Sequence, residues 1–88
     1  MKKHVVLNSD PWCIEWVDDI EECGLCDYAT RTIRIRNGLH LELEFDTVLH
    51  ELEHAQRPYL TEEVVDKHAT ERAKIVVDLY RPQRRVEN

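Results

Sequence analysis

Residues 50–54 carry the pattern in this sequence that is best suited to chemistry. They read His-Glu-Leu-Glu-His, so a glutamate follows the first of two histidines in the order H-E-x-x-H. On a helix, side chains four residues apart lie one above the other, so His50 and His54 can reach one metal ion while Glu51 holds a metal-bound water. The alternative is a charged surface helix without a ligand, because charged residues make up 34% of the chain.

A catalytic zinc site needs a third protein ligand and leaves its fourth position to water. The connection AQRPYLT is short enough to fold a second helix back, with its first turn near His54. On that helix Glu62 borders the apolar face, whereas Glu63 is rotated by about 100° toward solvent. We therefore predict Glu62 as the third ligand, with Glu63 and His68 as alternatives. Without a metal, Glu62 would simply complement the helix dipole.

Three further side chains are candidates for contacts with a substrate or with a transition-state oxyanion. They are Tyr59, His68 and Arg72. His68 lies six residues after Glu62, a rise of about 9 Å, so the two do not share one ion. We interpret His68 as a core residue or as a residue that supports a metal ligand. Each of the three side chains also has a purely structural interpretation.

Composition bounds the class of protein that carries these residues. Hydrophobic residues are 42% of 88, as in folded soluble domains, and no apolar run approaches the roughly 18 residues of a membrane span. The formal net charge of −6 argues against nucleic acid as a partner. We expect one small domain over residues 1–82, without a membrane partner, and a charged tail at 83–88.

The cysteines are Cys13, Cys23 and Cys26, an odd number that argues against a disulfide framework. Cys23 and Cys26 form C-x-x-C, but no second pair completes the four ligands of a structural zinc site. We expect free thiols and a cytoplasmic protein.

The first part of the chain is expected to form a strand and then a helix. Residues 3–8 are rich in β-branched side chains, which predicts the strand. Ser9 or Asp10 is expected to cap a helix that begins at Pro11 and ends near Gly24. The helix is suggested by an i, i+4, i+8 stripe that consists of Trp12, Trp16 and Ile20.

Residues 25–37 predict two β arms around a turn near Ala29 and Thr30. The second arm, TIRIR, alternates apolar and basic residues and is our candidate for the sheet edge on which an extended peptide would pair.

Two helices are expected to follow. The first carries the H-E-x-x-H motif, is established by about Asp46 and ends before Pro58. Thr61 is expected to cap the second, which Pro82 stops. The predicted apolar face of the second helix consists of Val64, Val65, His68, Ala69, Arg72, Ile75, Val76 and Leu79.

Two segments resemble a known family. TVLHELEHA is similar to the active-site helix of the zinc-dependent metallopeptidases called zincins, and TEEVVD resembles the N-E-x-x-x-D segment of the thermolysin-like gluzincins. The likeness covers residues 47–66, and the two-helix arrangement looks like that of small, phage-type metallopeptidases.

This resemblance implies a role for each matching residue. His50, His54 and Glu62 would bind Zn²⁺, and Glu51 would be the general base. Asp66 would be a carboxylate that orients a ligand histidine.

We therefore predict an α+β, minimal zincin-like domain, in which a small, mostly antiparallel sheet packs on the H-E-x-x-H helix and the following helix closes the site. The predicted function is zinc-dependent hydrolysis of a peptide bond in a peptide or protein substrate. One alternative is a non-catalytic, zinc-stabilised interaction domain, which would close its fourth metal position with protein and have no use for Glu51. Another is a DNA-associated protease.

Overall fold

The structure, a computed structural model, describes the backbone of residues 1–85 and the side chains of residues 1–80. Four strands precede two helices: β1 (Lys2–Leu7), β2 (Asp10–Val17), β3 (Gly24–Asp27), β4 (Thr32–Arg36), α1 (Leu41–Gln56) and α2 (Glu62–Arg85). The predicted α+β class is confirmed. Within the predicted charged tail, residues 86–88 lie outside the described part of the chain.

The four strands form one sheet in the order β1-β2-β4-β3. β2 and β4 are parallel, and the other two pairings are antiparallel. The TIRIR segment is β4, which has a strand on each side, so its prediction as a sheet edge is wrong. β3 is the edge strand on that side of the sheet, and it also packs against α1.

The predicted helix from Pro11 is wrong, because residues 10–17 form strand β2. Side chains at i, i+2 and i+4 share one face of a strand, so a pair of tryptophans four apart fits a strand as well as a helix. Trp12 and Ile14 are buried in the core. The two-residue turn before β2 has positive φ at Asn8 (52°) and Ser9 (69°), as a tight hairpin requires.

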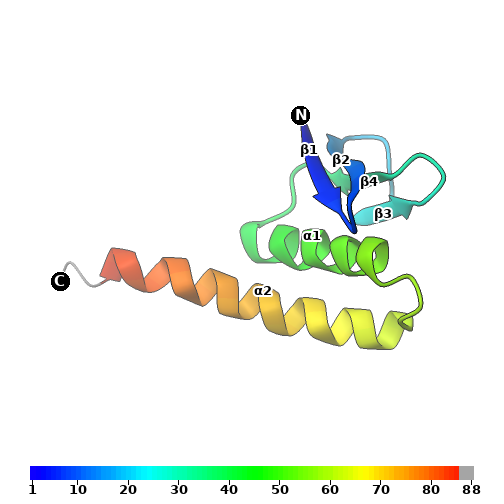
Figure 1. Ribbon diagram of the computed structural model, residues 1–88. Coiled ribbons are helices and arrows are strands. Elements are labelled where there is room, and N and C mark those ends of the chain that lie inside the picture. Colours follow the sequence, from blue (N-terminus) through cyan, green and yellow to red (C-terminus); the bar gives the residue numbers. More distant parts are fainter. Residues whose placement is uncertain (86–88) are drawn as a thin grey trace.

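Helix α1 is the middle layer of the molecule (Figure 1): the sheet packs on one side of it and α2 on the other. Its first turn is capped by His40, whose Nδ1 accepts from the backbone N–H of Leu43. The helix ends at Gln56, before Pro58, as predicted. The core between the sheet and α1 is formed mainly by Leu7, Trp12, Ile14, Ile33, Ile35 and Ala55.

Helix α2 begins at the predicted cap, where the Oγ1 of Thr61 accepts from the N–H of Val64 at 3.3 Å. It runs through Pro82 to Arg85, so the predicted stop at this proline is wrong. A proline removes one i→i−4 hydrogen bond, but its fixed φ near −65° is itself helical, so the chain can continue.

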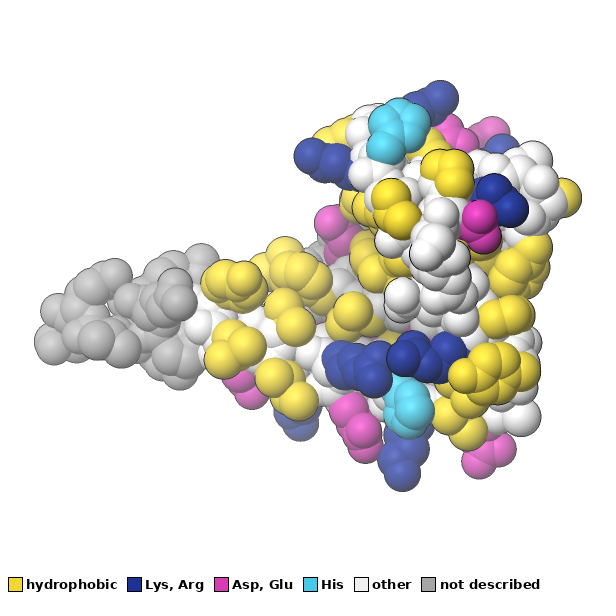
Figure 2. Space-filling view, in the orientation of Figure 1, with side chains coloured by type: hydrophobic (Ala, Val, Ile, Leu, Met, Phe, Trp, Pro, Cys, Tyr) yellow, Lys and Arg dark blue, Asp and Glu magenta, His cyan; other side chains and the backbone are white. Residues whose placement is uncertain are grey.

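The buried stripe of α2 differs from the predicted face. It consists of Val65, Ala69, Ala73 and Val77, of which only the first two were predicted. Val64, Ile75 and Leu79 of the predicted face are exposed. Helix α2 extends beyond α1 (Figure 1), and hydrophobic side chains gather on the visible side of the part of this extension whose side chains are described (Figure 2). Neither helix, within the described residues, has the length and hydrophobicity of a membrane-spanning segment.

A buried carboxylate ties the two helices together. Glu53 of α1, 3% exposed, accepts from Arg57 at 2.7 Å and from Arg72 of α2 at 2.6 Å. Burial acts to raise the pKa of Glu53, but the hydrogen bonds and charges of the two arginines outweigh it. The pKa therefore lies below its ordinary value of 4.5. Arg72, a predicted substrate contact, is instead engaged in this interhelical link.

This lowered pKa predicts a pH dependence of stability. Glu53 stabilises the fold above its unfolded-state pKa of about 4.5, and the contribution is lost as pH falls through the lower folded-state pKa. Glu53→Gln should lower the free energy of unfolding at pH 7 by about 1–3 kcal/mol and flatten the acid branch of the stability curve. Urea unfolding between about pH 3 and 7 measures both. Glu71→Gln, at an exposed position of α2, is the control, and equal curves for the two variants would contradict the assignment.

Candidate metal centre

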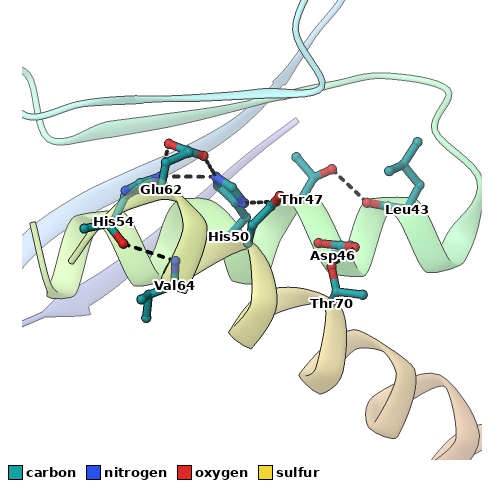
Figure 3. A network of polar contacts seen from close by, with 10 residues as sticks. Leu43, Asp46, Thr47, His50, His54, Glu62, Val64 and Thr70 are labelled. Atoms are coloured by element: carbon teal, nitrogen blue, oxygen red, sulfur yellow. Dashed lines mark hydrogen bonds and ion pairs between the residues drawn. The ribbon is translucent and has the colours of Figure 1, made fainter.

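Helix α1 and the first turn of α2 bring three possible metal ligands together. The Nε2 atoms of His50 and His54 lie 3.1 Å apart, because the two residues are one helical turn apart on α1. Glu62 bridges them from α2, with Oε1 2.6 Å from His50 Nε2 and Oε2 3.1 Å from His54 Nε2 (Figure 3). One ligand atom from each residue lies within 4.8 Å of the others.

These distances suit one small cation. In a tetrahedral zinc site with bonds of about 2.0–2.1 Å, neighbouring ligand atoms are about 3.3 Å apart. The observed separations of 2.6–3.1 Å need to widen by about 0.2–0.7 Å to reach that value. The set of two imidazole nitrogens and one carboxylate oxygen is one that zinc accepts, and three protein ligands leave a position free.

A second carboxylate stands behind the first histidine. Asp66, one turn after Glu62 on α2, has its Oδ1 3.3 Å from the Nδ1 of His50. A carboxylate at Nδ1 fixes the tautomer that leaves the Nε2 lone pair free for a metal. The structure thus brings His50, His54, Glu62 and Asp66 together, while the alternative ligand Glu63 is exposed and outside this cluster.

Glu51 is buried beside the cluster, with 8% of its surface exposed. Burial raises its pKa, as does the nearby charge of Glu62, while the two histidines act to lower it. Among the described residues, none donates a hydrogen bond to its carboxylate. Glu51 is therefore a proton acceptor whose lone pairs are not already used.

Gly24, the first residue of β3, allows the sheet to approach Glu51 closely. A Cβ atom at this position would lie 2.6 Å from the side chain of Thr47 and 3.0 Å from Cγ of Glu51. Ordinary van der Waals contact requires more than that. The absence of a side chain at Gly24 therefore sets the distance between the edge strand and the carboxylate.

Tyr28 follows β3 and places a phenol at the same site. Its hydroxyl donates to the backbone carbonyl of His54 at 2.8 Å, and its ring packs edge-to-face on Trp12 with centroids 6.2 Å apart. Its pKa is raised by burial first, then by Cys26 and by the carboxylates Glu51 and Glu62. The phenol therefore stays protonated and can act as a hydrogen-bond donor at neutral pH.

Two open cavities flank Glu51 and share Gly24, His50 and Glu51 in their walls. The first, here called the acidic cavity, has a volume of about 270 Å³ and is lined by Cys23, Gly24, Leu43, Asp46, Thr47, His50, Glu51 and Asp66. The second, here called the metal cavity, has a volume of about 460 Å³ and is lined by Gly24, Leu25, Cys26, Tyr28, His50, Glu51, His54 and Glu62.

The three predicted substrate contacts line neither cavity. Tyr59 is 78% exposed, Arg72 binds Glu53, and His68 is half-buried with no hydrogen bond to its Nδ1. Cys23 and Cys26 do line the cavities, and they are free, as expected. Burial and the charge of Glu51 raise the pKa of Cys26 to about 11, so its thiol is neutral.

Gly24, Tyr28 and Asp46 are site residues that the sequence analysis missed. The two β arms were predicted, but no sequence pattern identified the first of them, β3, as the edge strand or as the strand that packs on α1. The signal available for Gly24 was a glycine at the start of a strand, which often marks close approach of another segment.

In comparisons with known proteins, no family model, no curated protein and no solved structure matches the chain. The resemblance to zincins therefore remains a prediction, and the case for a metal centre depends on the geometry above.

This geometry predicts different metal affinities for two neighbouring glutamates. Glu62→Ala should weaken zinc binding by at least about 100-fold, the upper end of the loss when a residue behind the ligands is removed. Glu63→Ala should leave the affinity unchanged, because Glu63 lies outside the cluster. Competition with a chromophoric chelator measures both constants. Equal affinities for the two variants would rule out Glu62 as a ligand.

Proposed function

We propose that the protein is a zinc-dependent hydrolase of peptide bonds. His50, His54 and Glu62 hold the metal, Asp66 orients His50, and Glu51 is the general base. The observation that carries this proposal is the convergence of the three donor atoms within 4.8 Å beside a buried carboxylate with no other partner.

The donor set favours a catalytic role over a purely structural one. A structural zinc site is closed by four protein ligands, most often thiolates and imidazoles. Here the described residues supply three, and no cysteine belongs to the cluster. Zinc, when bound, would polarise a carbonyl oxygen and lower the pKa of its water ligand to about 7.

Glu51 then performs the proton transfers. Its carboxylate accepts a proton from the attacking water and delivers it to the nitrogen of the leaving amine. The raised pKa makes Glu51 a stronger base for the first step, and its conjugate acid is still far more acidic than the protonated amine, so it can complete the second step. Tyr28 also lines the metal cavity, where its one hydroxyl proton is donated to the backbone carbonyl of His54.

An extended peptide is the substrate that best fits this surface. β3 pairs with β4 on one side only, and Gly24, Leu25 and Cys26 of β3 line the metal cavity. A peptide that adds to this edge by backbone hydrogen bonds would cross Glu51 and the metal ligands. The partner is thus a peptide or an unfolded segment of a protein. The free cysteines favour a cytoplasmic location.

Glu51→Gln tests the proposed base. The amide cannot accept the proton, so hydrolysis of a labelled unfolded protein by the zinc-loaded chain should fall by at least about 100-fold. Zinc affinity should remain, because Glu51 is not a ligand. Glu42→Gln, at an exposed position of the same helix, is the matched control and should retain full activity.

Two other outcomes would redirect the interpretation. Unchanged cleavage by Glu51→Gln would exclude this residue as the base. A wild-type chain that binds zinc tightly, is stabilised by it and cleaves nothing would instead be the zinc-stabilised interaction domain.

A further inference from the structure

The acidic cavity contains a carboxylate, Asp46, that has no role in the metal centre. Asp46 of α1 and Asp66 of α2 both line it, together with Glu51. The Oδ2 of Asp46 accepts from the hydroxyl of Thr70 at 3.1 Å (Figure 3). Asp66 contacts His50. Among the described residues, neither aspartate forms an ion pair with a lysine or an arginine.

The cavity is part of a site and not merely a cluster of acidic groups on a surface. Glu51, more than nine-tenths buried, lines it with a carboxylate that has no hydrogen-bond donor among the described residues. Leu43 and Thr47 supply apolar surface to the same walls. A ligand with an aliphatic stem and a cationic head therefore matches the lining, because the stem packs on apolar atoms while the charge meets carboxylates.

A side-chain cation suits this cavity better than a second metal ion. Within the described part of the chain, the only three side chains arranged to hold a metal are His50, His54 and Glu62. Asp46 and Asp66 lack a comparable third ligand. The volume of about 270 Å³ is large for a bare ion and can hold a long side chain.

We propose that the acidic cavity is a specificity subsite that binds a lysine or arginine side chain of the substrate next to the bond that is cleaved. This inference depends on the proposed function for the position of that bond. The two cavities meet at Gly24, His50 and Glu51, so a peptide crossing the base places one residue on each side of it. The substrate residue that enters the acidic cavity is the lysine or arginine.

Matched fluorogenic peptides that differ only at the residues flanking the cleaved bond test this subsite. With zinc-loaded wild-type protein, kcat/KM for a peptide with Lys or Arg on one side should exceed that for Met by at least tenfold. The preference should weaken as ionic strength rises, because salt screens the attraction. Glu at the same position should give the poorest substrate.

Variants at Asp46 assign the preference to the cavity. Asp46→Asn should reduce the Lys over Met ratio at least threefold, and Asp46→Lys should turn the preference toward Glu. Asp78→Asn makes the same chemical change at an exposed position of α2 and should leave the ratio unchanged. Equal kcat/KM for Lys and Met peptides, or a preference unaffected by Asp46→Lys, overturns the subsite.

A binding measurement separates this inference from the proposed function. Fluorescence anisotropy with chelator-treated protein, which cannot turn over, should show at least tenfold tighter binding of the Lys peptide than of the Met peptide. If this preference is present and depends on Asp46 while the zinc-loaded chain cleaves nothing, the cavity is upheld and the hydrolase proposal fails. If cleavage occurs and neither assay shows a preference, the cavity assignment alone fails.

Discussion

The approach of one carboxylate to two imidazoles across a helix pair is the interaction on which the candidate site depends. Glu62 reaches His50 and His54 only because Thr61 begins α2 immediately before it and the short connection turns α2 back along α1. The buried link from Glu53 to Arg72 fixes the two helices further along. On its other side α1 is held by the sheet, so both supports of the cluster are packed elements and not loops.

The same packing concentrates negative charge that the fold must tolerate. Glu51, Glu62, Asp66 and Asp46 lie around one histidine pair in a chain whose formal net charge is −6. Carboxylates held this close repel one another. Burial is the main cause of the raised pKa of Glu51, and the charge of Glu62 adds to it. A divalent cation would reverse the sign of this interaction, since each carboxylate would then be attracted to it. Metal binding is thus expected to stabilise the domain as well as to equip it for chemistry.

Local chemistry in the sequence predicted the helical half of the molecule. Pro58 and Thr61 determine where one helix ends and the next begins, and helical geometry alone separates Glu62 from Glu63. The β2 strand was missed because tryptophans four apart satisfy both periods, and Asn8-Ser9 was not recognised as a hairpin turn. The roles of Gly24, Tyr28 and Arg72 depend on which distant segment lies beside them. No local pattern encodes that neighbour.

X-ray absorption at the zinc edge tests the metal centre most directly, because it measures the ligands of the bound ion. The geometry predicts two imidazoles and oxygen ligands at about 2.0–2.2 Å, with one oxygen from solvent. Glu62→Ala should lose one of these oxygen ligands, which would identify that oxygen as belonging to the carboxylate of Glu62. A sulfur ligand at about 2.3 Å would show that Cys23 or Cys26 binds the metal instead, and would contradict a centre built from His50, His54 and Glu62 with an open position.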